Sequence, residues 1–231
     1  MFYDRGPPEA AERVAEWDGG VSWIAHPDER GQRASHAIET DEGLWLVDPL
    51  DATNLESLLD PLGEVVGVAV LSAWHTRDAG VLARRHDVAV HVPTWMGRVA
   101  ERVDAPVERY TLDPTEEFRV RPCLPLPAWQ EGFLYHEQSD TLVVPDSLGT
   151  VEYWLVGDKR LGVSLLRRPQ PPVQLRGLDP ERVLVGHGAG VNEHAAAALE
   201  TALAGARRNL PRALVEGGPT AVRGVLAALR N

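Results

Sequence analysis

Residues 71–80 read LSAWHTRDAG and join a strongly apolar segment to one with helical character. The preceding run, VVGVAVL at 65–71, is typical of a strand that is buried on both faces of a parallel sheet. Residues 79–85 have a helical pattern and 88–92 form the next apolar segment, which together predict a β-α-β unit. Because ligand sites in α/β sheets collect at the carboxyl ends of strands, the polar turn at 75–78 is a candidate site.

The segments on either side of this unit predict two mixed sheets with helices outside them. An amphipathic helix is expected over 8–17, closed by Asp18-Gly19-Gly20, and a Pro-rich surface loop or flap over 167–180. Further helices are expected at 55–60 (capped by Thr53 or Asn54), 95–102, 192–209 (capped by Asn192) and 220–230. Strands are expected at 21–25, 35–40, 44–47, 107–111, 117–121, 132–136, 140–145 and 183–185. We expect one domain over residues 1–231.

The composition restricts the class of partner. Hydrophobic residues make up 44% of the 231 residues, which is enough for a sizeable core. The 34 acidic and 23 basic residues give a net charge of −11, which argues against nucleic acid and anionic membranes. Cys123 is the only cysteine, so neither an intrachain disulfide nor a thiolate metal cluster is expected. Because the sequence shows neither a membrane-length apolar run nor a signal-peptide pattern, we expect a cytoplasmic protein. We expect its partner to be a small molecule, and a homodimer is left open.

Aspartate or histidine follows four of the predicted apolar strands. These residues are Asp48 after LWLV, His75 and Asp78 after VVGVAVL, Asp146 after TLVVP, and His187 after VLVG. Imidazole and carboxylate groups are ligands for Zn²⁺ and similar cations, so the four strand ends could form one metal site. Each also has a structural interpretation: Asp48 and Asp146 suit turns, and Asp78 suits a helix cap.

Four segments resemble the metallo-β-lactamase fold superfamily in order and spacing. GLWLVDPLDA at 43–52 matches the family's strand that ends in aspartate, and LSAWHTRDAG takes the place of its L-T-H-x-H-x-D-H-x-G motif. TLVVPDSLG at 141–149 is similar to the strand before its bridging aspartate, and VLVGHGAG at 183–190 to its late Gly-His-Gly. The likeness covers nearly the whole chain. It implies an α/β fold of four layers, an αββα sandwich, with two metal ions in a cleft at the sheet edges.

The resemblance assigns four residues to the first metal-binding motif, and two of them cannot bind a metal. Ala73 falls on the first histidine of the motif and His75 on the second. Arg77 falls on its aspartate, and Asp78 falls on its third histidine.

The remaining family ligands fall on Trp129, Asp146 and His187. Trp129 replaces a histidine, whereas Asp146 matches the bridging aspartate and His187 the last histidine. If a metal is retained, the resemblance implies that Asp78, Asp146 and His187 hold one ion, with His75 as a fourth ligand.

The charge of Arg77 favours loss of the metal site. A divalent ion about 4 Å from a guanidinium is repelled by roughly 8 kcal/mol at an effective dielectric constant near 20. We therefore expect a divergent member without the dinuclear site and its hydrolase activity, and without a cofactor. Its polar cleft, lined by Asp48, Arg77 and Trp129, would bind a small ligand. The alternative is a hydrolase of an ester, thioester or lactone with one Zn²⁺ (or Mn²⁺ or Fe²⁺), and with His75 and Asp78 as candidate catalytic residues. A non-catalytic interaction protein is the third alternative.

Overall fold

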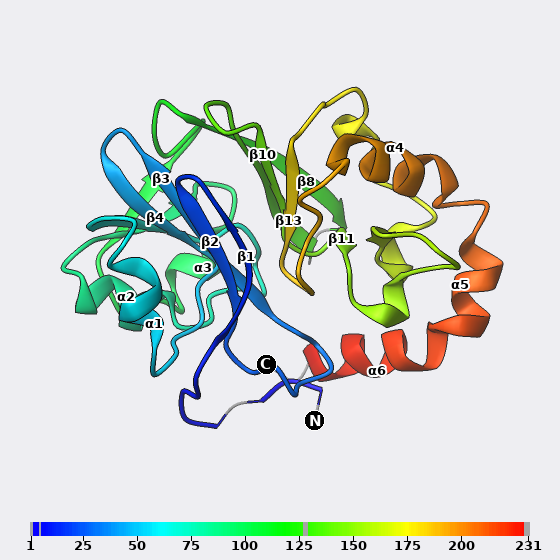
Figure 1. The fold of residues 1–231 in the computed structure, drawn as a ribbon, viewed down its shortest axis with the longest axis horizontal. Coiled ribbons are helices and arrows are strands. Elements are labelled where there is room, and N and C mark those ends of the chain that lie inside the picture. The colour runs from blue at the N-terminus through cyan, green and yellow to red at the C-terminus, as the bar shows by residue number, and fades with distance from the viewer. Residues whose placement is uncertain (1, 5, 127–128, 229–231) are drawn as a thin grey trace.

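The computed structural model describes residues 2–4, 6–126 and 129–228 and contains two mixed sheets packed against each other (Figure 1). The larger sheet has the order β1-β2-β3-β4-β5-β6-β7, and the smaller sheet has the order β13-β10-β9-β8. The larger sheet consists of Glu12–Trp17, Gly20–Ile24, Ala34–Thr40, Gly43–Val47, Val65–Ala69, Val90–Pro93 and Val107–Tyr110. In the order given, the smaller sheet consists of Arg182–Val185, Thr141–Val144, Trp129–His136 and Phe118–Leu126. A short ribbon pairs β11 (Leu148–Gly149) with β12 (Gly162–Val163).

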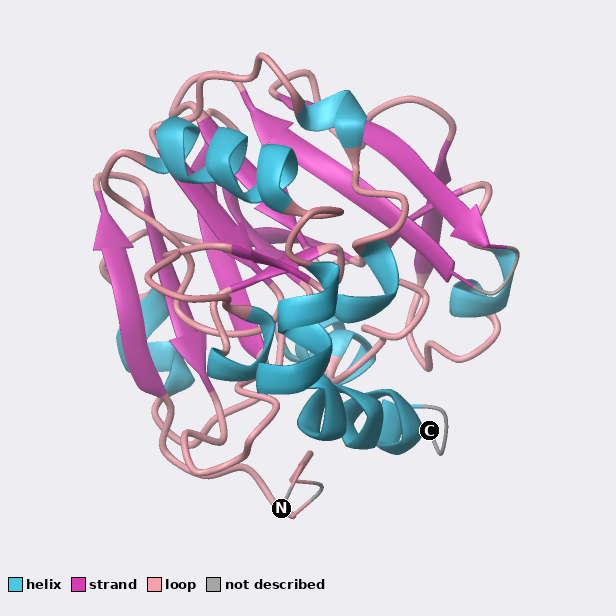
Figure 2. Ribbon diagram, turned by 90° about the vertical axis from the view of Figure 1, so that its right-hand side faces the viewer, coloured by secondary structure: helices cyan, strands magenta, loops and turns pink. Residues whose placement is uncertain are grey.

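Helices cover the outer faces of both sheets (Figure 1, Figure 2). The larger sheet carries α1 (Leu55–Leu59), α2 (Ala79–Arg85) and α3 (Gly97–Ala100), and the smaller sheet carries α4 (Ala195–Gly205). The chain then continues through α5 (Leu210–Glu216) and α6 (Gly218–Ala228). Short 3₁₀ turns occur at Glu152–Trp154, Leu165–Arg167 and Val173–Leu175. The four-layer αββα arrangement expected from the sequence is confirmed.

The period-two alternation of strand side chains builds three separate apolar layers. In β4, Leu44 and Leu46 face the helices α1 to α3, whereas Trp45 faces the other sheet. In β10, Val143 faces the larger sheet and Leu142 packs toward α4. Strands of this kind are buried on both faces, and this is why they appear in the sequence as nearly continuous apolar runs.

The helix expected over 8–17 is wrong, because Glu12–Trp17 is the edge strand β1. Trp17 pairs with Gly20 across the two-residue turn Asp18-Gly19, and Gly19 has a φ of 82°. An Asp-Gly pair strongly favours such a hairpin, and this local preference outweighs the amphipathic pattern of the preceding residues.

The C-terminal helices also differ from expectation. The helix predicted from Asn192 to 209 begins only at Ala195, after His194, and ends at Gly205. The Pro-rich segment is not a free flap, because Leu175 is buried in the core beneath α4. Among the described residues, no helix is long and apolar enough to cross a membrane.

Candidate functional site

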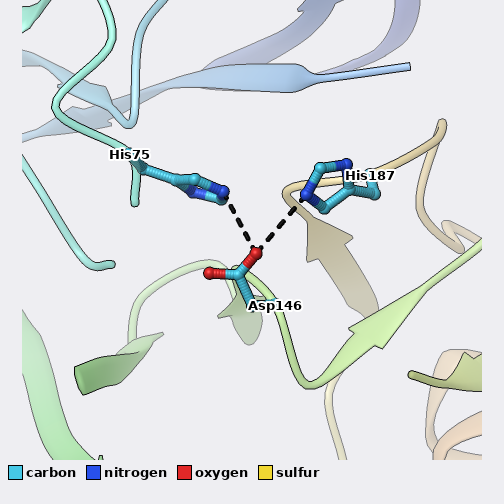
Figure 3. A group of neighbouring side chains, drawn as sticks. All are labelled: His75, Asp146 and His187. Carbon is cyan, nitrogen blue, oxygen red and sulfur yellow. Dashed lines mark ion pairs between the residues drawn. The ribbon is translucent and has the colours of Figure 1, made fainter. Parts of the chain in front are cut away.

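Three buried side chains meet between the two sheets (Figure 3). His75 lies in the turn after β5, Asp146 follows β10, and His187 follows β13. Oδ1 of Asp146 lies 3.2 Å from Nε2 of His75 and 3.4 Å from Nε2 of His187. One ligand atom from each residue lies within 4.8 Å of the others, and no second group of three His, Cys, Asp or Glu side chains is so arranged in the described part of the chain.

Strand pairing explains why residues far apart in the sequence meet here. β10 and β13 are parallel neighbours, so Asp146 and His187 leave the same edge of the smaller sheet. His75 comes from the larger sheet, and an isolated bridge between Ser72 and Glu131 ties its turn to β9. Three of the strand ends singled out in the sequence thus bring their side chains to one place.

Hydrogen bonds on the far side of each ring fix both imidazoles. Nδ1 of His75 lies 2.8 Å from Oδ2 of Asp48, and Nδ1 of His187 lies 2.7 Å from the carbonyl oxygen of Gly31. A carbonyl oxygen only accepts hydrogen bonds, so Nδ1 of His187 carries the proton. Asp48 is itself held because its Oδ1 accepts a hydrogen bond of 2.8 Å from the N–H of Leu71. Each ring therefore directs its Nε2 toward Oδ1 of Asp146.

The central carboxylate is ionised despite its burial. Burial alone would favour the neutral acid, but the two imidazoles outweigh it and hold the pKa of Asp146 well below its usual range. Ser72 Oγ donates a hydrogen bond of 2.5 Å to its other oxygen, Oδ2. Burial and the Arg77 guanidinium disfavour a proton on His75, but the Asp146 and Asp48 carboxylates outweigh them and raise the pKa of His75.

The guanidinium of Arg77 lies beside this group and is anchored by backbone carbonyls. Its Nη1 donates to the carbonyls of Ala34 (2.5 Å) and Asp48 (2.7 Å), and its Nη2 donates to that of Gly186 (3.1 Å). The same Nη2 lies 3.2 Å from Nε2 of His75. Burial lowers the pKa of Arg77, but a guanidinium keeps its charge at every relevant pH. A fixed positive charge is therefore in contact with one of the three ligand atoms.

The other residues expected in the site lie around it in different ways. Asp78 is outside the group of three, because its Oδ2 accepts a hydrogen bond of 2.9 Å from the N–H of Asp51. Of the four ligands suggested by the sequence, the structure groups His75, Asp146 and His187 and leaves Asp78 outside. Trp129 lines a cavity next to Asp146, and its ring contacts that of Trp74 with 5.0 Å between centroids. Ala73 has no ligand atom, and Asp48 lies behind His75.

Glu131 is a residue of the site that sequence analysis missed. It is fully buried in β9, and its Oε1 accepts hydrogen bonds from the N–H groups of Asp146 (2.7 Å) and Ser147 (2.8 Å). Its Oε2 accepts from Ser147 Oγ (2.6 Å) and Trp129 Nε1 (3.0 Å). Burial and the Asp146 carboxylate raise the pKa of Glu131 to about 7. Glu131 therefore sets the position of the loop that carries Asp146.

Two of the three separations between the ligand atoms are close to those expected around one metal ion. Ligands about 2.0–2.1 Å from a tetrahedral Zn²⁺ lie roughly 3.4 Å apart, close to the 3.2 and 3.4 Å separations measured from Asp146 Oδ1. The bonds from Asp48 and Gly31 are the kind that orient metal-binding histidines. Among the described residues that the resemblance places at ligand positions, Asp78 is the one further donor for a second ion, and its Oδ2 accepts a hydrogen bond from the N–H of Asp51.

Comparisons with known proteins give structural matches only. No protein-family model matches the chain, and no curated protein matches it. Diflavin flavoprotein A 5 (fragment 1-254) from Nostoc sp. PCC 7120 has a TM-score of 0.61 and 14% identity, covering 90% of this chain and 98% of that chain. The metallo-β-lactamase FIM-1 from Pseudomonas aeruginosa, in a mono-zinc form, has a TM-score of 0.56 and 11% identity, covering 90% and 98%. The metal-soaked Flv1 flavodiiron core from Synechocystis sp. PCC6803 has a TM-score of 0.59 and 13% identity, covering 91% and 62%. At these identities the likeness shows the fold: the chain has the metallo-β-lactamase fold.

Proposed function

We propose that this chain has lost the two-metal centre of its fold and uses the remaining cleft to bind a small ligand without a metal. The observation that carries the proposal is the place of Arg77, whose Nη2 lies 3.2 Å from the ligand atom of His75. Three backbone carbonyls hold this guanidinium, so moving it away would break three hydrogen bonds in a buried environment.

The residues that would complete two metal positions are also missing. Ala73 and Trp129 supply no donor atom where the resemblance expects histidines. Hydrolysis at such a centre depends on a metal-bound hydroxide as the nucleophile. A chain that holds no ion under cellular conditions would therefore bind ligands in this cleft without that reaction.

Metal content measured by mass spectrometry tests the proposal directly. The protein is purified without an affinity-metal column, soaked with Zn²⁺, Mn²⁺ or Fe²⁺, and desalted. We expect far less than one ion per chain, and no difference from the His187→Ala and Asp146→Ala variants. About one ion per chain, lost in both variants, would overturn the proposal.

A hydrolase with a single metal ion is the second candidate, and the convergence of three acceptor atoms favours it. His75, Asp146 and His187 would hold the ion, which would supply a more acidic bound water and polarise an ester, thioester or lactone carbonyl. Asp48 would keep His75 in the tautomer with a free Nε2, and the Gly31 carbonyl would do the same for His187. A hydrolysis activity that a chelator abolishes and Zn²⁺ restores would establish this alternative. Turnover that is indifferent to the chelator would exclude it.

A further inference from the structure

A cavity of about 70 Å³ opens beside Asp146 and His187, and five of its twelve lining residues are Tyr or Trp. The aromatic residues of the wall are Tyr3, Trp74, Trp129, Tyr153 and Trp154. At about 10–15 Å³ for each water-sized group, the cavity has room for roughly five to seven such groups.

The aromatic rings pack edge to face, and this fixes their orientation. The Trp154 ring lies 5.3 Å from that of His187 and 6.1 Å from that of Tyr153, between centroids. Trp74 and Trp129 form a second pair at 5.0 Å. Aromatic faces carry partial negative charge, so a ring that turns its face to the cavity attracts apolar groups and cations and does not attract anions.

Asp146 gives the cavity its only formal charge. Among the described residues of the wall there is no arginine or lysine. Arg77 is directed at the carbonyls behind His75, and Arg167 donates to Ser147 Oγ with its guanidinium 5.9 Å from the centre of the Trp129 ring. A carboxylate or phosphate in the cavity would therefore meet the Asp146 carboxylate without a compensating cation in the wall.

An unpartnered hydroxyl provides an independent sign of a ligand. Ser164 is in the wall and only 4% exposed, and its Oγ has no hydrogen-bond partner. Buried polar groups almost always have a partner, so an orphan hydroxyl beside a cavity suggests that a ligand or an ordered water completes it.

We propose that this cavity binds a small organic cation, with a ring between the aromatic side chains, an ammonium group toward Asp146 and a polar substituent toward Ser164. The inference rests on the metal-free function proposed above, because an ion on Asp146 would cancel the charge that selects the ligand. If the guanidinium of Arg77 faced the cavity, the cavity would prefer anions. Because this guanidinium donates to backbone carbonyls instead, we expect the opposite preference.

Three probes with one ring and different charges test this selectivity: benzylammonium, benzyl alcohol and benzoate. Their affinities are measured by calorimetry on protein whose metal content has been determined in the same sample. We expect benzylammonium to bind at least tenfold more tightly than benzyl alcohol, and benzoate more weakly than both. Equal affinities, or tightest binding of benzoate, would overturn the inference.

Variants identify the residue that makes the cavity selective for a positively charged ligand. Asp146→Asn should abolish the preference for benzylammonium, whereas Asp158→Asn, an equal change in net charge at an exposed position, should leave it intact. Should Asp146→Asn fail to fold, Trp154→Leu is informative, since loss of the cation–π contact should weaken benzylammonium more than benzyl alcohol. An Asp146→Asn or Trp154→Leu protein that keeps the full preference would contradict the assignment.

The metal analysis separates this inference from the proposed function. If the protein holds about one ion per chain, the proposed function fails, and the probes are measured again after chelation. A preference for benzylammonium that emerges in the chelated protein supports the inference, and its absence there refutes it. If the protein holds no ion and still shows no preference, the inference alone fails.

Discussion

Replacing Arg77 with glutamine should convert the cleft into a metal-binding site. The substitution removes one positive charge and keeps an amide that can donate to the surrounding carbonyls. The Nδ1 bonds to Asp48 and Gly31 that hold the two rings do not involve the Arg77 side chain, so we expect His75, Asp146 and His187 to keep their spacing when the 3.2 Å contact between Arg77 Nη2 and His75 Nε2 is lost. We therefore expect the variant to bind Zn²⁺ where the original chain does not.

The size of the effect follows from the geometry. An ion about 2.0 Å from His75 Nε2 would lie roughly 4–5 Å from Arg77 Nη2, which is itself 3.2 Å from that nitrogen. A divalent ion and a unit charge at this separation repel by about 7–8 kcal/mol at an effective dielectric constant near 20. Relaxation and water entry will reduce this value. If only a third remains, about 2.5 kcal/mol, the affinity for Zn²⁺ still rises by more than fiftyfold.

Competition with a chromogenic chelator measures the affinity, and thermal unfolding followed by circular dichroism confirms that the variant is folded. Arg84→Gln is the matched control, since it also removes one positive charge. Arg84 lies in α2, and its guanidinium pairs with the exposed carboxylate of Asp104. The control should bind no more Zn²⁺ than the original chain. A folded Arg77→Gln protein whose Zn²⁺ affinity stays within threefold of the original would refute the electrostatic reasoning.

Three further predictions concern stability. Gly186→Ala should destabilise the fold by about 1–3 kcal/mol in urea unfolding, because the new Cβ would lie 2.6 Å from Cε1 of His75; an unchanged midpoint would contradict this. Glu131→Gln should cost about 1–3 kcal/mol by leaving the Trp129 N–H without its acceptor, and adding Trp129→Phe should recover part of that loss. Burial lowers the pKa of His36 to about 3, so its contribution to the free energy of unfolding is complete above pH 6.5 and falls as the pH drops toward 3, by at most about 1.4 kcal/mol per pH unit. The His36→Gln variant should therefore lose less stability than the original chain between pH 7 and pH 5, and equal losses would show that another group is responsible.

The fold could be predicted from the sequence because it depends on patterns that local sequence carries. Continuous apolar runs such as 65–71 indicate strands that are buried on both faces, and an Asp or His follows several of these runs in the sequence. The hairpin at Trp17–Gly20 was missed because two local signals conflicted, and the Asp-Gly turn outweighed the helical pattern.

The site could be predicted only in part, because side-chain direction depends on backbone geometry and burial. Asp78 occupies a ligand position of the motif, but its carboxylate faces the Asp51 N–H. Arg77 has a φ of 40°, an unusual conformation for a residue with a side chain. The residue types of the motif do not predict this backbone conformation. No sequence pattern indicated a role for Glu131. Its role depends on the pairing of β9 with β8 and on the position of the loop after β10, whose Asp146 N–H donates to Glu131.

On the metal-free function that we propose, the charges in the cleft would favour a monocation over a divalent ion. Asp48 and Asp146 contribute two negative charges next to His75, and Arg77 contributes one positive charge, so these three groups together carry one negative charge. A proton on His75 or an organic ammonium group in the adjoining cavity balances that charge, whereas a divalent ion would leave a net positive charge in a buried place. Because uncompensated buried charge is costly in either sign, this proposal expects Arg77, in the place of the motif's aspartate, to change the preferred occupant as well as to remove a ligand.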